Sequence, residues 1–375
     1  MRTHRGRLVP WRAEAGSGAA RGTRRLVVGA DRRQLRFTQR GGHGRVWHEV
    51  LPRLAALADL RLPFTRVSPE GARLTLGPGR RPDVWLIGGG PWPSAQPVVS
   101  VIYEVGWHTP YLRSLLTPEF ASMADGATRT AIEASDWVIV PAEASRSQVV
   151  EAYQVDPDRV RVVPLGVDLD HFRPGRGGGR QLVARARGGL DGPYVLFTGN
   201  LGPRKNLVAV RQAMEGIARR GLPHCLVVVA GGAPDRVDPE ADRMAGAELD
   251  GAAGRVVRIR KPSDADLAAL MAGADAFCMP SLAEGFGLPL LEAMACGTAV
   301  VTSNRGSLPE VVGDAGLAVE PTAEAVEEAL AAVLTGDQMR SGLGAAGRAR
   351  AETMSWDATA GGWLDVLSVA AARGR

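Results

Sequence analysis

The sequence predicts an α/β protein with two doubly wound parallel-sheet domains that face each other across a cleft. Its 375 residues exceed the length at which one hydrophobic core stops growing, so two domains are expected. Short apolar runs of strand length alternate with longer amphipathic segments along most of the chain. A Gly-rich stretch, PGRGGGR at 174–180, interrupts this alternation and divides the chain into two parts.

Residues 25–170 form the first predicted domain. Its apolar runs predict strands, and apolar residues spaced three and four apart predict helices. The alternation of the two is typical of a Rossmann-like parallel sheet, whose ligands sit beyond the carboxyl ends of the strands. The predicted strands are 26–29, 84–87, 98–103, 137–140 and 160–163, and the predicted helices are 46–59, 118–135 and 144–153.

Residues 171–192 are predicted to be a linker, because PGRGGGR holds too much glycine for a regular element. Residues 193–354 then form a second Rossmann-like domain, and a C-terminal helix occupies 355–375. Ser263 is the expected N-cap of a helix at 264–272, with Asp266 three positions on. The other predicted elements are strands 194–198, 226–230, 256–259, 276–279, 299–302 and 317–319, and helices starting at 206 and 288.

The formal charge of +5 belongs to one end of the chain. Residues 1–25 hold seven Arg and one Glu, a balance of +6, which leaves −1 for the rest. Residues 1–24 have no periodicity, so we predict a disordered basic tail. A solvated arm, or an over-extended start of the reading frame, is the favoured interpretation. Peripheral contact with anionic lipid at the inner face of the membrane is the alternative.

Composition indicates a cytoplasmic protein. The tail lacks the apolar core of a secretory signal, and no apolar run approaches the ~18–20 residues of a membrane helix. Cys225, Cys278 and Cys296 are widely spaced in apolar segments, which predicts buried thiols in a reducing compartment. No basic patch interleaved with aromatic residues occurs beyond residue 25, and this argues against nucleic-acid binding.

The most informative segment is PSLAEGFGLPLLE, residues 280–292, between a predicted strand and a predicted helix. Gly285 and Gly287 remove side chains just before the helix, and Pro289 stands near its first position. Bare backbone N–H groups then converge at the positive helix end, which predicts a diphosphate site. The third glycine of the dinucleotide fingerprint is missing, so a nicotinamide cofactor is disfavoured.

Glu284 and Glu292 bracket this loop with seven residues between them. Part of a helix separates them, so they do not fit the ~5–9.5 Å spacing of a glycosidase pair. A carboxylate at Glu292 suits the two hydroxyls of a bound ribose. The alternative for Glu292 is structural, a carboxylate in the first turn that complements the helix dipole.

A second candidate site is GNLGPRKN, residues 199–206, directly after the predicted strand 194–198. A glycine turn followed by Arg204 and Lys205 offers two cations to phosphate oxygens. Lys205 and Lys261 are the only lysines among 45 basic residues, which indicates that a compact ammonium is required at 205. Lys261 is expected on a loop surface, and for Arg204 a solvated helix start is the alternative.

The first domain offers weaker candidates. GGHGR, residues 41–45, lies between a predicted strand and a predicted helix, where a Gly-rich turn lets a ligand approach the backbone. A flexible loop is the alternative. His108 follows the strand 98–103 at its carboxyl end and suits a hydrogen bond to a sugar hydroxyl. Packing beside Trp107 explains His108 equally well.

These motifs resemble the group 4 family of retaining glycosyltransferases, which have the GT-B fold of two Rossmann-like domains. The resemblance is dense from about residue 195 to 321 and looser through GGHGR, ASDWVIVPAEASRSQVV and VRVVPLGVDLDHFRP. It implies an acceptor domain at 25–170, a nucleotide-sugar donor domain at 193–354, and a C-terminal helix that crosses back to the first domain. Retention without a covalent enzyme intermediate is the mechanism that we expect.

The resemblance also implies roles for single residues. Arg204 and Lys205 would hold the donor diphosphate, and Glu284 would touch the donor sugar. Relatives carry a His-Asp pair where Tyr103 and Glu104 stand here, so His108 is the candidate for the missing imidazole. The implied donor contacts are Gly42, Gly199, Asn200, Ile259, Arg260, Gly285, Phe286, Gly287, Leu288 and Glu292.

The expected reaction moves a hexose from a nucleotide-diphosphate sugar to a glycan or lipid-linked acceptor. GNLGPRKN is most similar to the version in mannosyl- and rhamnosyl-transferring relatives, which favours these sugars. We expect no metal cofactor, since no Asp-x-Asp stands at a strand end. Two alternatives remain open: a phosphorylase that uses phosphate as acceptor, and a non-catalytic nucleotide-sugar-binding scaffold of a glycan-assembly complex.

Overall fold

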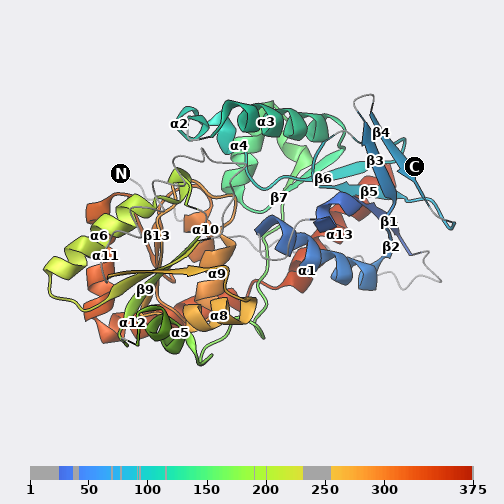
Figure 1. Ribbon diagram of the computed structural model, residues 1–375. Helices are drawn as coiled ribbons and strands as arrows, with labels where there is room; N and C mark the ends of the chain where they lie inside the picture. The colour runs from blue at the N-terminus through green and yellow to red at the C-terminus, as the bar shows by residue number, and fades with distance from the viewer. Residues whose placement is uncertain are drawn as a thin grey trace.

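The computed structural model contains two six-stranded parallel sheets with helices packed against them, here called the N-domain and the C-domain sheets (Figure 1). The predicted α/β class with two doubly wound domains is confirmed. The structure describes residues 25–36, 42–68, 71–76, 78–90, 92, 94–114, 116–189, 191–199, 201–230 and 255–373. The predicted basic tail 1–24 and the candidate residue Asn200 lie outside the described residues.

The N-domain sheet has the strand order β2-β1-β5-β6-β7-β8, and all neighbouring strands are parallel. The chain continues from β1 to β2 on one side and later to β5 on the other, so the strand order reverses between β1 and β5. Doubly wound sheets bind ligands at such a switch point. The strands are β1 (Val27–Ala30), β2 (Asp59–Arg61), β5 (Val84–Ile87), β6 (Val98–Val101), β7 (Trp137–Val140) and β8 (Val160–Val162).

Helix α1 (Gly42–Leu57) begins earlier than the sequence predicts. Gly42 and the later residues of GGHGR form its first turn. Val46, Trp47 and Val50 lie on the buried face of the helix, and the helix extends from them toward the N-terminus as far as Gly42. Strand β2 and the antiparallel hairpin β3 (Phe64–Ser68) and β4 (Gly71–Thr75) were not predicted. The other helical elements are η1 (Arg32–Arg36), η2 (Gly106–His108), α2 (Pro110–Arg113), α3 (Pro118–Glu133), α4 (Glu143–Tyr153) and η3 (Pro157–Arg159).

The C-domain sheet has the order β11-β10-β9-β12-β13-β14, again with parallel neighbours. Its order reverses between β9 and β12, so the loops after these two strands meet at one edge. The strands are β9 (Tyr194–Gly199), β10 (Cys225–Ala230), β11 (Val256–Arg260), β12 (Ala276–Met279), β13 (Val300–Ser303) and β14 (Leu317–Val319). The helical elements are η4 (Pro203–Lys205), α6 (Leu207–Arg219), α8 (Asp264–Gly273), α9 (Leu288–Ala295), α10 (Leu308–Val312), α11 (Ala323–Thr335) and α12 (Asp337–Ala351).

The predicted linker 171–192 is not free of regular structure. Helix α5 (Gly179–Ala186) lies within it and packs against α8. The glycine content that argued against an element ends at Gly179, and the helix-forming sequence QLVARA follows. A Cβ on Gly179 would lie 2.1 Å from the backbone oxygen of Ala269, so this glycine permits the close approach of the two helices. The predicted capping box of α8 at Ser263 and Asp266 is confirmed.

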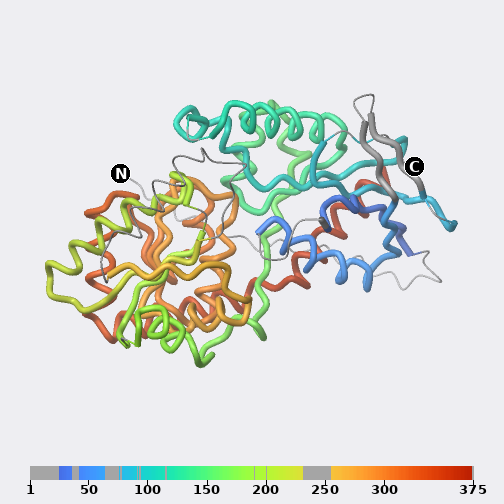
Figure 2. The backbone as a smooth tube through the Cα atoms, viewed as in Figure 1, coloured from blue at the N-terminus to red at the C-terminus, as the bar shows by residue number. Residues whose placement is uncertain are grey.

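The last helix, α13 (Trp356–Arg373), leaves the C-domain and packs along α1 (Figure 2). The rings of Trp363 and Trp47 meet edge-on with centroids 5.5 Å apart, and both side chains are fully buried. The two crossings between the domains lie against each other, because Val167 N donates to Met354 O at 3.1 Å. The two segments that connect the domains are therefore hydrogen-bonded to each other.

The three cysteines are buried free thiols, as the sequence predicted. Burial raises the pKa of the Cys278 thiol strongly, so it stays protonated. None of the helices in the described ranges combines the length and the apolar character needed to cross a membrane.

Candidate active site

The candidate site lies where the carboxyl ends of strands from both sheets meet. From the C-domain, η4 follows β9 and the loop 280–287 follows β12, the two strands at the switch point. From the N-domain, Tyr103 and Glu104 follow β6. Gly285 joins the two sides, because a Cβ there would lie 2.1 Å from the backbone oxygen of Tyr103. Only glycine allows the loop to come this close to the N-domain backbone.

Glu284, Lys205 and Arg204 form one charged cluster. Lys205 Nζ lies 2.5 Å from Glu284 Oε1, and Arg204 Nη1 lies 3.2 Å from Glu284 Oε2. Lys205 and Glu284 are 8% and 9% exposed, so this pair is largely removed from water. The structure thus brings together three residues that the sequence selected from segments about 80 positions apart.

The Glu284 carboxyl is ionised in this cluster. Burial works to raise its pKa, but Arg204 and Lys205 outweigh this effect and lower the pKa to about 2. An ionised carboxylate only accepts hydrogen bonds, so Glu284 suits a role as acceptor for sugar hydroxyls and as anchor for the two cations. It does not suit the role of a general acid near neutral pH.

The ion pairs of Glu284 predict a pH dependence of stability. The folded-state pKa of about 2 lies below the unfolded value of about 4.3, so the unfolded chain binds this proton more readily. The stabilisation is fully present above about pH 4.3 and is lost as the pH falls toward the folded pKa. Urea unfolding of the wild type and of Glu284→Gln should therefore give a difference in unfolding free energy that shrinks between about pH 6 and about pH 3. A difference that stays constant across this range contradicts the assignment.

The turn after β9 is shaped to hold the Lys205 side chain. A Cβ on Gly199 would lie 3.3 Å from Lys205 Cγ, so the glycine leaves room for the lysine stem over the end of the strand. Asn206 follows in the left-handed conformation with φ of 57°. Its Nδ2 donates to Pro280 O at 3.2 Å and to Pro321 O at 2.8 Å, which ties this turn to the loops after β12 and β14. The position of Lys205 is fixed locally by these two neighbours.

The start of α9 presents backbone donors. Gly287 is the N-cap residue with φ of 100°, a conformation that favours glycine, and Pro289 occupies the first turn. None of the hydrogen bonds found among the described residues uses the backbone N–H of Gly285, Phe286 or Gly287. These donors and the positive end of the helix have an arrangement that suits an anion, in the loop whose Glu284 pairs with Lys205.

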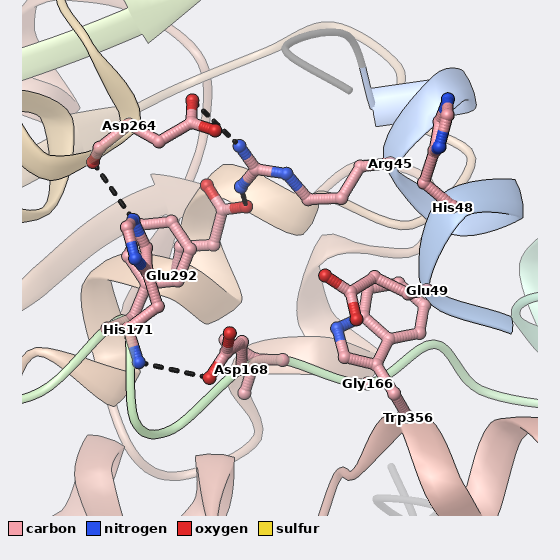
Figure 3. A pocket seen from close by; sticks show the side chains of 11 residues that line it. Arg45, His48, Glu49, Gly166, Asp168, His171, Asp264, Glu292 and Trp356 are labelled. Atoms are coloured by element: carbon pink, nitrogen blue, oxygen red, sulfur yellow. Dashed lines mark hydrogen bonds and ion pairs between the residues drawn. The ribbon is translucent and has the colours of Figure 1, made fainter. Parts of the chain in front are cut away.

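Glu292 lies further along α9 and is covered by an N-domain residue. Arg45 Nη1 contacts Glu292 Oε1, and Arg45 Nη2 lies 3.6 Å from Asp264 Oδ1 (Figure 3). Burial raises the pKa of Glu292 more than Arg45 lowers it. Arg45 belongs to the GGHGR motif, but the sequence analysis did not select it.

A cavity of about 130 Å³ adjoins this ion pair (Figure 3). It opens between α1, the start of α8 and the segment around Val167, where the chain first crosses from the N-domain to the C-domain. Its lining is mostly polar, with seven charged or histidine side chains among eleven residues, which distinguishes it from an apolar ligand pocket. The lining residues are Arg45, His48, Glu49, Gly166, Val167, Asp168, His171, Phe172, Asp264, Glu292 and Trp356.

His108 lies in a separate cluster of the N-domain. Its Nε2 is 2.7 Å from Asp125 Oδ1, and Tyr153 donates to the same oxygen at 2.9 Å. Partial burial works to raise the pKa of Asp125, but the hydrogen bonds from Tyr153 and His108 lower it below its ordinary value. No contact found among the described residues joins His108 to Glu284 or Lys205.

The remaining candidates occupy the rims of the site. Gly42 starts α1, and a Cβ there would lie 3.8 Å from Leu288 Cδ1 of the C-domain. Ile259 and Arg260 end β11, the edge strand of the C-domain sheet, at the same carboxyl edge as Gly199. Within the described residues, no group of three or more His, Cys, Asp or Glu side chains is placed to hold a metal ion.

Three polar residues at the domain boundary make contacts that sequence reasoning did not predict. Glu104 Oε2 lies 3.5 Å from Arg204 Nη1, and Ser145 Oγ donates to Gly285 O at 2.9 Å. Glu310 accepts hydrogen bonds from the first two backbone N–H groups of α4, at 2.8 and 2.7 Å, and so caps an N-domain helix from the C-domain. Of these three residues, only Glu104 could be connected with the site from the sequence, since it stands at the end of a predicted strand.

Two family models match the chain in order. Residues 79–171 match Glycosyltransferase Family 4, and residues 184–350 match Glycosyl transferases group 1. The chain belongs to the group 4 family of glycosyltransferases. The loop 280–287 and the turn after β9 both lie inside the second match.

Curated relatives of this family show how far the likeness extends. The D-inositol 3-phosphate glycosyltransferase of Segniliparus rotundus is 36% identical over 235 residues, which cover 61% of this chain and 51% of the relative. The enzyme of the same name from Saccharomonospora viridis is 35% identical over 270 residues, which cover 69% and 61%. The chain therefore spans between half and two thirds of the length of these relatives.

Solved structures support the fold. Sucrose-phosphate synthase from Thermosynechococcus elongatus superposes with a TM-score of 0.70 at 22% identity, and the match covers 92% of this chain and 99% of that one. At this identity the likeness concerns the fold alone, which is the GT-B fold that the resemblance implied.

Proposed function

We propose that this protein is a retaining glycosyltransferase that moves a hexose from a nucleotide-diphosphate sugar to an acceptor hydroxyl between the two domains. The observation that supports the proposal is the meeting of Lys205 and Arg204 on Glu284, in the loop whose bare backbone precedes α9. Membership of the family supports the same reaction. Two cations and convergent N–H groups suit the charge that develops on a leaving diphosphate.

The donor would bind mainly to the C-domain. The diphosphate would accept hydrogen bonds from the backbone of Gly285 and Gly287 and pair with Lys205, while Glu284 would accept hydrogen bonds from sugar hydroxyls. Glu292 would receive the ribose diol. Because Arg45 now contacts Glu292, ribose binding requires Arg45 to move or to share the carboxylate.

In the proposed reaction, the bond between the anomeric carbon and the β-phosphate oxygen lengthens first. The acceptor oxygen then forms a bond to the same face of the anomeric carbon, and its proton passes to the leaving phosphate oxygen. Lys205, Arg204 and the helix end stabilise the negative charge on the diphosphate. No step requires a metal ion, because the protein supplies the cationic groups.

The sugar and the acceptor are proposed more narrowly from sequence likeness. Mannose and rhamnose are the favoured sugars, and a glycan or lipid-linked hydroxyl is the favoured acceptor. The relatives carry the name D-inositol 3-phosphate glycosyltransferase, so inositol 3-phosphate belongs in the same test. Phosphate is a further acceptor to include, since its consumption would identify a phosphorylase.

Thermal-shift measurements test donor binding directly. GDP-mannose, dTDP-rhamnose and UDP-glucose are added in turn, and the matching donor is expected to raise the melting temperature because it binds only the folded state. The shift is expected to persist in EDTA. Product formation is then measured with each acceptor. A panel without any shift or turnover would overturn the proposal, and a shift without turnover would support a nucleotide-sugar-binding scaffold.

A further inference from the structure

Glu104 is an N-domain carboxylate that lies against the loop before α9. It follows β6 at the carboxyl edge of the N-domain sheet. A Cβ on Gly285 would lie 3.2 Å from Glu104 Cβ, so the side chain of Glu104 begins beside the bare backbone of that loop. Its Oε2 ends 3.5 Å from Arg204 Nη1. These two approaches hold Glu104 on the N-domain side of the proposed donor site.

One guanidinium nitrogen joins carboxylates of both domains. Arg204 Nη1 lies 3.2 Å from Glu284 Oε2 and 3.5 Å from Glu104 Oε2. The Glu284 side chain is 8% exposed and is also paired with Lys205, whereas the Glu104 side chain is 39% exposed. Glu284 is therefore enclosed in the C-domain cluster, and Glu104 faces the same cation with a carboxylate that solvent can reach.

The Glu104 carboxylate has capacity for further hydrogen bonds. Its separation from Arg204 is that of an ion pair, and no other polar contact of its side chain is found within the described ranges of the chain. A carboxylate accepts at two oxygens with about four lone-pair sites. A ligand with hydroxyl groups can therefore bind Glu104 without displacing a protein donor.

The charge of Glu104 restricts the kind of ligand group that can bind there. A donor diphosphate at the neighbouring loop would bring a second negative charge close to this carboxylate, and two anions repel unless a cation or a proton donor lies between them. Arg204 is the cation between them. In the proposed reaction the acceptor hydroxyl must also come beside the leaving phosphate oxygen, and it carries the proton that a carboxylate accepts in a hydrogen bond.

We propose that Glu104 is the N-domain residue that binds the acceptor, with its carboxylate accepting a hydrogen bond from an acceptor hydroxyl. The inference rests on the transferase function proposed above. Glu104 takes no proton in the reaction, because the proton of the attacking hydroxyl passes to the leaving phosphate oxygen. The acceptor contact that the sequence analysis sought in His108 is thus assigned to Glu104.

Two substitutions of Glu104 test this role with the donor and acceptor pair that turns over in the panel above. Glu104→Ala removes both accepting oxygens and should lower kcat/KM for the acceptor roughly 10- to 100-fold, the usual loss of a hydrogen bond to a charged group. Glu104→Gln keeps one accepting oxygen and nearly the same shape, so its kcat/KM should fall between those of Ala and the wild type. Glu133→Ala, which removes an exposed glutamate of the same domain, is the matched control.

Nucleotide binding separates this role from simple support of Arg204. GDP, UDP and dTDP are titrated calorimetrically into the wild type and into Glu104→Gln, without any acceptor. The nucleotide that binds the wild type should bind Glu104→Gln at least as tightly, because the substitution removes a negative charge near the diphosphate. If Glu104 only held Arg204 in place, its loss would weaken nucleotide binding instead.

An unchanged kcat/KM for the acceptor in folded Glu104→Ala overturns the inference, as does weaker nucleotide binding by Glu104→Gln. Urea unfolding shows whether each variant is folded, and the nearly isosteric Gln variant carries the test if Ala is not. Failure of the transferase proposal is distinct, because the wild type would then neither bind a donor nor form product.

Discussion

Replacing Lys205 with alanine is expected to lower kcat by a factor on the order of 10²–10³. This is the usual loss when one preorganised group that stabilises the negative charge of the transition state is removed. Lys205 Nζ lies 2.5 Å from Glu284 Oε1 in the loop before α9, and its side chain is held over Gly199 in a largely buried position. A solvent cation would replace it poorly, because the site excludes most water. Steady-state rates with the donor identified by thermal shift measure the effect.

The result must be separated from a loss of folding. Arg211→Ala removes a half-buried cation of α6 that pairs with Glu215, and it serves as the matched control. Unfolding in urea should show that Lys205→Ala remains folded at the assay temperature. If the folded variant turns over at the wild-type rate, Lys205 has no part in the mechanism.

Replacing Trp363 with alanine is expected to lower the free energy of unfolding by about 3–5 kcal/mol, the usual cost of removing a large buried aromatic side chain. Trp363 is fully buried on α13, where it packs edge-on against Trp47 of α1. The substitution leaves a cavity between the returning helix and the N-domain. It should therefore weaken the attachment of α13 as well as the core.

Urea unfolding monitored by circular dichroism measures this loss. Val369→Ala shortens another apolar side chain of α13, but Val369 is 47% exposed, so its effect should be within about 0.5 kcal/mol. Equal effects of the two substitutions would contradict the view that Trp363 holds α13 to the N-domain.

The elements with buried, continuous apolar sequences are predicted well. The strands at 84–87, 137–140 and 276–279 have the predicted bounds, because parallel strands covered on both faces need unbroken β-branched and apolar runs. The partly exposed edge strand at 317–319 also has its predicted bounds. The β3–β4 hairpin mixes polar and apolar residues and stands outside the two main sheets. Helix α5 was hidden by the glycines before it. The sequence patterns of the hairpin and of α5 are both weak when only one sequence is read.

The residues of the candidate site also divide into those that the sequence predicts and those that it does not. Glycines before a helix and cations after a strand are local patterns, so Gly285, Gly287 and Lys205 could be selected from the sequence. Their partners across the boundary between the two domains could not be selected from the sequence. Arg45 and Glu292 are 247 positions apart, and no periodicity links them.

The sequence by itself determined the two parallel-sheet domains and the donor side of the cleft, because strand, turn and helix signals act within a few residues of each other. Only the tertiary structure decided which N-domain groups face that side: Arg45 on Glu292 and Glu104 near Arg204. These contacts depend on how α13 and the paired crossings orient the two sheets. Orientation is set by packing over the whole boundary, and no local pattern encodes it.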